Sequence, residues 1–361
     1  MTVETLSKNE KLTLYGLVRF PTYNDRRLSE QIKLKMSTVT AIRNRLKRDG
    51  YFKTVRVPYL ERLGGELLVV AYTRLDVLKS KEDLQRILKE TIGATEDVFY
   101  AFADQFGMLT FSFCRNYTDA WTDSERMHQT LAEKGALSPK YSRQHVALFP
   151  INQTKLFKFF DFSRILRAQF ELELPEPELQ INPKAEKGPQ RHLSRIEKRV
   201  YYGLIRFPEL VDNSVAKKIG VTRQSVTKIR KRFESEKLMA TMRIPDFQKM
   251  GAEIIAMSYF EFAPSITFTT RKKSIDWSLK ELPAFFQVAG NREGMIVVLI
   301  RKFEDLQRQL YEAARFYLEK GYFKEELKIT AFSVKDLYLV KDFTFAPLVK
   351  KVLGIEDEKG K

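Results

Sequence analysis

Apolar residues near the N-terminus are spaced three or four positions apart, which predicts a group of short amphipathic helices. The first helix begins at a capping box, Ser7-x-x-Glu10, and ends near Pro21. The second carries Leu28 and Ile32 on one side. The third has a stripe at i, i+3 and i+7, formed by Val39, Ile42 and Leu46. Residues 53–58 follow as a β-rich segment, which fits the wing strand of a winged helix-turn-helix.

The same pattern occurs a second time in the chain, 187 residues further on. Leu-Val-Arg-Phe-Pro at 17–21 recurs as Leu-Ile-Arg-Phe-Pro at 204–208, and a second capping box, Ser194-x-x-Glu197, opens the corresponding helix. The register continues without a gap to Gly107-Met108, which matches Gly294-Met295. The chain is therefore a tandem duplication.

The second part of each copy contains strand-like and helix-like stretches in the order βαββαβ. The predicted strands are 67–75, 98–103, 108–114 and 144–149 in the first copy, and 254–262, 285–289, 295–301 and 327–334 in the second. Each copy ends with a further amphipathic segment, 160–170 or 343–353. This order predicts an α+β fold of two repeats, each a winged helix-turn-helix followed by a ferredoxin-like domain.

The predicted domain boundaries follow from these patterns and from a proline-rich stretch between the copies. They are a winged helix-turn-helix (1–60), a ferredoxin-like domain (61–173), a linker (174–190), a second winged helix-turn-helix (191–247), a second ferredoxin-like domain (248–354) and a tail (355–361).

The net charge of the chain indicates what kind of partner it binds. The 361 residues include 63 Lys and Arg against 46 Asp and Glu, a formal net charge of +17. Such an excess attracts polyanions, of which nucleic acid is the commonest. The apolar runs are too short to span a membrane, and the N-terminus lacks the features of a secretory signal. The single cysteine, Cys114, allows no intrachain disulfide and indicates a reducing, cytoplasmic environment.

Polar residues between the apolar positions of each third helix are the predicted DNA-binding residues. Hydroxyl groups at a helix start can approach phosphates, while Arg, Lys, Asn and Gln can reach base edges. The first copy offers Ser37, Thr38, Thr40, Asn44, Arg45 and Arg48, with Lys53 and Arg56 on the wing strand. The second copy offers Arg223, Gln224, Ser225, Thr227, Lys228, Lys231 and Arg232, with Arg243 on the wing strand. We expect double-stranded DNA as the partner, with Arg56 and Arg243 contributing to the salt dependence of binding.

The junction between the two parts of each copy resembles that of the Lrp/AsnC family of bacterial and archaeal transcription regulators. It reads Pro58-Tyr-Leu-Glu-Arg-Leu-Gly64 and Pro245-Asp-Phe-Gln-Lys-Met-Gly251, before the βαββαβ domain. The resemblance covers nearly the whole chain, although the usual member has one copy, and the composition suggests an archaeal member. It implies a transcription regulator, with the basal transcription machinery and a small-molecule effector as further partners. It also implies an effector or assembly turn at Gly290, Asn291 and Gly294; the first copy departs from this pattern with Ala103-Asp-Gln-Phe-Gly107.

Signs of catalysis are scarce in the sequence. It contains no phosphate-binding glycine loop, Cys-x-x-Cys pair or zincin helix, and its three histidines, His128, His145 and His192, are scattered. We therefore predict no catalytic residue, metal or cofactor, and no enzyme. One alternative is a sirohaem decarboxylase, because those enzymes resemble Lrp-like folds, occur as paired or fused repeats and use His and Arg around a tetrapyrrole. The scarcity of histidine and the large positive charge argue against it. The other alternative is a non-specific nucleic-acid or chromatin binder.

The duplication also predicts how DNA would be read. We expect an intramolecular pseudo-dimer, as a monomer or further assembled into a homodimer, with its third helices about 34 Å apart, one turn of DNA. The core positions of these helices are alike, whereas Ser37, Ala41 and Asn44 are replaced by Gln224, Lys228 and Lys231. The predicted DNA site therefore has two parts and is not palindromic.

Overall fold

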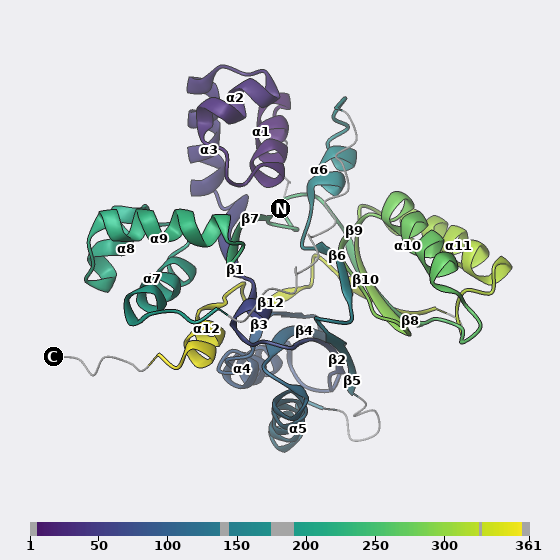
Figure 1. Cartoon of the computed structure of the whole chain (residues 1–361). Coiled ribbons are helices and arrows are strands. Elements are labelled where there is room, and N and C mark those ends of the chain that lie inside the picture. Colours follow the sequence, from purple (N-terminus) through teal and green to yellow (C-terminus); the bar gives the residue numbers. More distant parts are fainter. Residues whose placement is uncertain (1–5, 138–143, 175–190, 325–326, 356–361) are drawn as a thin grey trace. The chain divides into compact units, whose positions relative to one another are not determined.

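The computed structural model describes residues 6–137, 144–174, 191–324 and 327–355 (Figure 1). Nearly all of the predicted linker and tail lies outside these residues. The chain has an α+β fold built from two repeats, as predicted. No helix within the described ranges is long and apolar enough to cross a membrane.

Three helices form the first part of each repeat. They are α1 (Lys8–Arg19), α2 (Asp25–Ile32) and α3 (Met36–Arg48), and then α7 (Arg195–Arg206), α8 (Asp212–Ile219) and α9 (Arg223–Ser235). Both predicted capping boxes are present, at Ser7 and Ser194. The Thr222 hydroxyl caps α9, whereas Lys35 makes no side-chain cap at the start of α3.

The strands after α3 and α9 pair with each other. These are β1 (Phe52–Pro58) and β7 (Met239–Pro245), which form a two-stranded sheet. The segment predicted as a wing strand is therefore a strand in each copy, and its partner is the equivalent strand of the other copy. A lone strand leaves its backbone groups without partners, and here the equivalent strand of the duplicate supplies them.

Each α/β domain contains the predicted strands in ferredoxin-like order. The first has β2 (Leu67–Arg74), β3 (Val98–Ala103), β4 (Gly107–Cys114) and β5 (Gln144–Pro150), with helices α4 (Lys81–Ile92) and α5 (Tyr117–Glu133). The second has β8 (Ile254–Glu261), β9 (Ala284–Ala289), β10 (Glu293–Ile300) and β11 (Lys328–Ser333), with α10 (Phe268–Glu281) and α11 (Phe303–Glu319). Figure 1 shows α10 and α11 side by side over one face of their sheet.

A fifth strand in each sheet comes from the other copy. The sheet orders are β12-β3-β4-β2-β5 and β11-β8-β10-β9-β6, where β6 is Lys155–Phe159 and β12 is Tyr338–Lys341. Residues 153–173 fall within the predicted first α/β domain, but β6 pairs with β9 of the second. This exchange satisfies the edge of strand β9 or β3, which would otherwise present unpaired backbone groups.

The chain consequently forms two compact units that are not its two consecutive copies. Unit 1 comprises residues 1–53, 153–184 and 243–335, and unit 2 comprises 54–152, 185–242 and 336–361. In unit 1, helix α6 (Ser163–Gln169) packs against α1, and in unit 2, helix α12 (Ala346–Leu353) packs against α7. Each trihelical group is thus joined to an α/β domain by the short helix that follows the exchanged strand.

Candidate functional site

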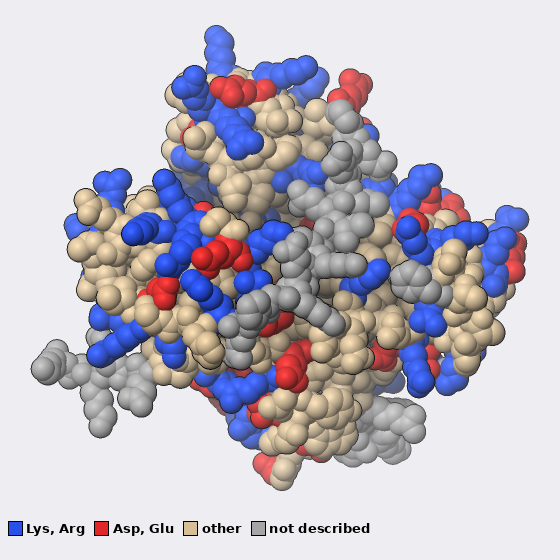
Figure 2. Space-filling view, viewed as in Figure 1, with Lys and Arg blue, Asp and Glu red and all other residues tan. Residues whose placement is uncertain are grey.

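The exposed faces of α3 and α9 carry part of the predicted DNA-binding set. On α3 these exposed residues are Ser37, Asn44, Arg45 and Arg48, while Thr38 is half-buried. On α9 they are Arg223, Gln224, Lys228 and Lys231, while Ser225 is half-buried beside the Thr222 hydroxyl. Figure 2 shows Lys and Arg side chains spread over both trihelical groups. Both third helices therefore present exposed cations on their outward faces.

Other predicted contacts hold the trihelical groups together. Asp25 accepts hydrogen bonds from the Thr40 hydroxyl, at 2.6 Å, and from Arg43, at 2.5 Å. In the second copy, Thr227 and Arg230 bind Asp212 in the same way, at 2.8 and 2.9 Å.

The capping glutamates engage two more of the predicted residues. Arg45 pairs with Glu10, and Arg232 pairs with Glu197. These four side chains, Thr40, Thr227, Arg45 and Arg232, stabilise helix packing, and sequence spacing could not distinguish them from outward-facing residues.

The cations of the wing strands are turned inward. Arg56 donates to the Leu204 carbonyl at 2.9 Å, and Arg243 donates to the equivalent Leu17 carbonyl at 3.1 Å. Both carbonyls lie in the last turn of a helix, where a guanidinium is favourable. Burial lowers the pKa of Arg56, and it lowers the pKa of Lys53 to about 8. The hydrogen bonds of Arg56 and Arg243 give these two cations a structural role and weigh against their binding of phosphate.

The predicted effector turn is closed by its own contacts. The Gly290 amide donates to the Glu293 carbonyl at 2.8 Å, and Arg271 binds the Asn291 carbonyl. A Cβ atom at Gly294 would lie 2.4 Å from the Phe260 ring. Close packing therefore accounts for glycine at position 294, and no cavity opens at this turn among the pockets described below.

A charged cluster that the sequence analysis missed lies between α5 and its sheet in unit 2. Lys351 Nζ of α12 donates to Asp97 Oδ2 at 2.7 Å and to Asp123 Oδ2 at 3.4 Å. The Asp97 side chain is 4% exposed and that of Asp123 is 13% exposed. Beside them is a pocket of about 10 Å³, lined partly by Cys114 and Ser124. Since Asp97 and Lys351 are 254 residues apart, no local signal could have paired them.

The two carboxyl groups of this cluster differ in pKa. Burial and the hydrogen bond with Asp123 raise the pKa of Asp97 to about 7. Burial also raises that of Asp123, but its hydrogen bond with Asp97 and the charge of Lys351 leave its pKa below the ordinary value. Burial raises the pKa of the Cys114 thiol, which makes the lone cysteine a packed rather than a reactive group.

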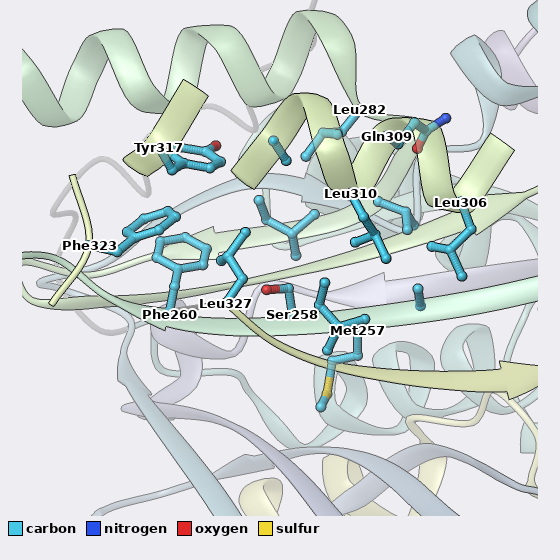
Figure 3. A pocket seen from close by; sticks show the side chains of 15 residues that line it. Met257, Ser258, Phe260, Leu282, Leu306, Gln309, Leu310, Tyr317, Phe323 and Leu327 are labelled. Atoms are coloured by element: carbon cyan, nitrogen blue, oxygen red, sulfur yellow. The ribbon is translucent and has the colours of Figure 1, made fainter. Parts of the chain in front are cut away.

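The equivalent space in unit 1, between α11 and the sheet of β8, β10 and β11, is an apolar cavity of about 50 Å³ (Figure 3). Its lining includes Phe260, Leu306, Leu310, Phe323 and Leu327. Position Gln309 of α11 stands where Asp123 stands in α5, so the acid pair of unit 2 has no equivalent here.

The three histidines lie apart in the sequence and on different elements. His145 is exposed on β5, His192 is exposed just before α7, and His128 is half-buried on α5 with its Nδ1 atom enclosed and unpaired. Within the described part of the chain, no group of three or more His, Cys, Asp or Glu residues could hold a metal ion.

Comparison with known proteins finds likeness in structure alone. No protein-family model and no curated protein matches the chain. The crystal structure of the siroheme decarboxylase NirDL matches 96% of this chain and 98% of its own, with a TM-score of 0.53 and 10% identity. The same enzyme in complex with an iron-uroporphyrin III analogue matches equally widely, with a TM-score of 0.52 and 11% identity. An AsnC family regulator from Agrobacterium tumefaciens matches 40% of this chain and 90% of its own, with a TM-score of 0.32 and 14% identity.

The prediction that the chain is not an enzyme is therefore wrong. The structures that match it from end to end are those of an enzyme, a decarboxylase, which was one of the two alternatives given in the sequence analysis. AsnC-type regulators are among its neighbours, over less than half of the chain. At this level of identity the likeness shows the fold: a tandem repeat of helix-turn-helix and α/β domain.

Proposed function

We propose that the chain is an enzyme of the siroheme decarboxylase type, which removes carboxylate groups from an iron tetrapyrrole. The observation that carries this proposal is the match to NirDL, which spans both trihelical groups and both α/β domains. The NirDL complex with an iron-uroporphyrin III analogue indicates the class of substrate.

The charge of the chain supports this substrate as well as it supports nucleic acid. A uroporphyrin bears several carboxylates and is a compact polyanion, so an excess of 63 basic over 46 acidic residues favours its approach. A large positive charge is therefore compatible with a tetrapyrrole substrate. Several arginines predicted to bind DNA are instead occupied within the protein, including Arg45, Arg56 and Arg232.

The chemistry of decarboxylation needs few protein groups. The carbon–carbon bond to the carboxylate breaks, CO₂ leaves, and the remaining carbon takes up a proton. An arginine can orient a carboxylate through paired hydrogen bonds, and a histidine can supply the proton near neutral pH. Among the histidines, His145 and His192 are exposed and able to meet a bound substrate. The pockets of about 50 and 10 Å³ are far too small for a tetrapyrrole, so neither is the proposed substrate site.

The experiment is to mix the purified full chain with sirohaem and with iron-uroporphyrin III, without oxygen. We expect a shift of the Soret absorption on binding and a product that has lost CO₂, detected by mass spectrometry. His145→Ala and His192→Ala are compared with the control His128→Ala. The variant that removes the proton donor should lower the rate by about 10²-fold or more, with the Soret shift retained.

The outcomes separate the steps of this proposal. A Soret shift without any product would leave a tetrapyrrole-binding protein and contradict the decarboxylase. No spectral change with either compound would overturn both. If all three histidine variants decarboxylate the substrate at the wild-type rate, none of these imidazoles is the proton donor.

A second candidate function, binding of double-stranded DNA, is favoured by the outward face of α9. Arg223, Gln224, Lys228 and Lys231 are all exposed on this helix. Gln224 can make a paired contact to adenine, and the cations can contact guanine or phosphate. The two-part site remains the prediction, with α9 reading one half and Ser37, Asn44 and Arg48 of α3 contributing to the other.

Footprinting of genomic fragments selected by the full chain tests this second function. Gln224→Ala should weaken discrimination in one half-site only, by about 1–3 kcal/mol. Lys228→Ala should weaken all sequences alike and reduce the salt slope by about one phosphate contact. Arg56→Met serves as a control for an inward cation. Binding that does not distinguish the selected fragments from bulk DNA would contradict a regulator and favour a non-specific binder.

A further inference from the structure

The apolar cavity of unit 1 exists because small side chains meet between helix α11 and the sheet. Ala256 and Ser258 on β8 and Ala313 on α11 are the small residues of the lining. Phe260, Leu306 and Leu310 line the same cavity (Figure 3). Helix α5 of unit 2 and helix α11 of unit 1 both have 17 residues, and Met127 of α5 takes the place of Ala313. The corresponding pocket there is about 10 Å³ instead of about 50 Å³.

One polar group of the cavity has no partner. The Ser258 Oγ atom is buried and makes no hydrogen bond. The Tyr317 hydroxyl at one end interacts with Ser274 and Ser278, and the side chain of Gln309 is half-exposed at the edge. None of the lining residues is charged.

Water fills such a space poorly. An ordered internal water requires two to four polar partners, and the buried part of the lining, away from Gln309 at the edge, offers one unpaired hydroxyl. A fully apolar guest would fill the volume but leave Ser258 unsatisfied. A guest with one hydrogen-bonding group would do both.

We propose that this cavity is a binding site for a small neutral molecule with an apolar body and a single hydroxyl or carbonyl group that pairs with Ser258. A free amino acid or a carboxylate does not fit this description, because its charges would be stranded in an apolar lining. The site lies within unit 1 and is independent of the tetrapyrrole proposed above. It is also separate from the turn of Gly290 and Gly294, where an effector was expected.

The test uses cyclopentanol and cyclopentane as probes, which differ by one hydroxyl group. Binding is followed in the full chain by NMR of labelled methyl groups. We expect saturable shifts at the cavity-lining methyls of Ile296, Leu306 and Leu310, and none at Leu84 and Leu88, which lie in the core of unit 2. Cyclopentanol should bind about tenfold more tightly than cyclopentane, because only it satisfies the hydroxyl.

Two variants test the geometry. Ser258→Ala should remove the tenfold preference for cyclopentanol and leave the affinity for cyclopentane unchanged. Ala313→Met, which installs the residue of unit 2, should abolish binding of both probes. Ser124→Ala, which changes a serine lining the pocket of unit 2, is the matched control and should leave both affinities unchanged.

Each alternative result contradicts the proposal. An absence of saturable shifts in the wild-type chain would show that the cavity is closed to guests. Shifts that persist in Ala313→Met would place binding elsewhere. If Ala313→Met does not fold, Ser258→Ala alone decides the test. An unchanged preference for cyclopentanol in Ser258→Ala would show that the Ser258 hydroxyl does not pair with the hydroxyl of the probe. Since the readout uses no tetrapyrrole and no turnover, failure here leaves the proposed function untouched.

Discussion

The two α/β domains have the same strand order but fill the space between helix and sheet in opposite ways. In unit 2, Asp97, Asp123 and Lys351 form a buried ionic cluster. In unit 1 the same space is apolar and partly empty, with an unpaired Ser258 hydroxyl. Duplication has thus preserved the backbone while the chemistry between its layers has diverged. A fold of this kind tolerates either solution provided that charges are paired and apolar surfaces stay covered.

The difference extends to how the short helices are anchored. Helix α12 is held by the charged contacts of Lys351 with two carboxylates. In unit 1, Arg164 of α6 instead binds the carbonyls of Leu279 and Lys280 at the end of α10. Only the carboxyl pair is expected to respond to pH near neutrality, because the pKa of Asp97 is about 7.

The largest expected effect comes from exchanging the residues that fill or empty the two spaces. Met127→Ala should lower the free energy of unfolding by about 2–5 kcal/mol, because it removes a buried side chain and leaves a cavity. The reciprocal Ala313→Met should raise it by about 1 kcal/mol if the new side chain fits the 50 Å³ cavity. Urea denaturation measures both. Two results would show that the spaces between helix and sheet in the two units are not packed in equivalent ways. One is a higher free energy of unfolding in Met127→Ala, and the other is a fall of more than about 1 kcal/mol in Ala313→Met.

Next in size is the loss of the cation from the ionic cluster. Lys351→Met leaves Asp97 and Asp123 without their shared partner and should lower stability by about 1.5–3 kcal/mol at pH 8. Hydrogen exchange should increase in α12. The control is Lys280→Met, whose pairing with Glu281 is exposed and should contribute almost nothing. Equal effects of the two substitutions would mean that the buried cluster is no stronger than a surface pair.

The sequence predicts features that depend on neighbouring residues, but not those that depend on contacts between distant segments of the chain. Capping boxes at Ser7 and Ser194, the cap at Thr222 and the βαββαβ order are local signals, and the structure confirms them. The exchange of β6 and β12 is not local. Because the segments after both α/β domains are alike, with Phe160 and Phe162 matching Phe343 and Phe345, sequence alone could not assign each strand to a sheet.

The candidate sites show the same limit. Helical spacing placed Arg45 and Arg232 on an outward face, but both also form ion pairs with the capping glutamates of the first helices. Net charge attracts any polyanion, so it favoured DNA and could not distinguish it from a carboxylated tetrapyrrole. The cluster of Asp97 with Lys351 depends on a contact between distant segments and had no signal in the sequence.

A smaller effect is the pH dependence that Asp97 gives to unit 2. Its pKa is raised to about 7 in the folded chain, so between about pH 4 and 7 the folded state binds more protons than the unfolded state. The contribution of protonated Asp97 to stability is fully present at pH values below the pKa that Asp97 has in the unfolded chain. It is lost as the pH rises through about 7. Relative to Asp97→Asn, the wild-type chain should therefore become less stable between pH 5 and pH 8. A parallel pair of stability curves over this range would contradict the raised pKa.

The smallest effect should have opposite signs in the two domains. Ser124 on α5 donates a hydrogen bond to the Gln144 side chain at 3.3 Å, so Ser124→Ala should lower the free energy of unfolding by about 0.5–1 kcal/mol. Ser258 has a buried hydroxyl with no partner, so Ser258→Ala removes an unsatisfied group from an apolar space. This second substitution should be neutral or stabilise the chain by about 1 kcal/mol. Thermal unfolding of the two variants side by side, without added ligand, gives the comparison. A loss of stability in Ser258→Ala would show that the hydroxyl already has a partner, and the cavity of unit 1 would then resemble the satisfied polar layer of unit 2.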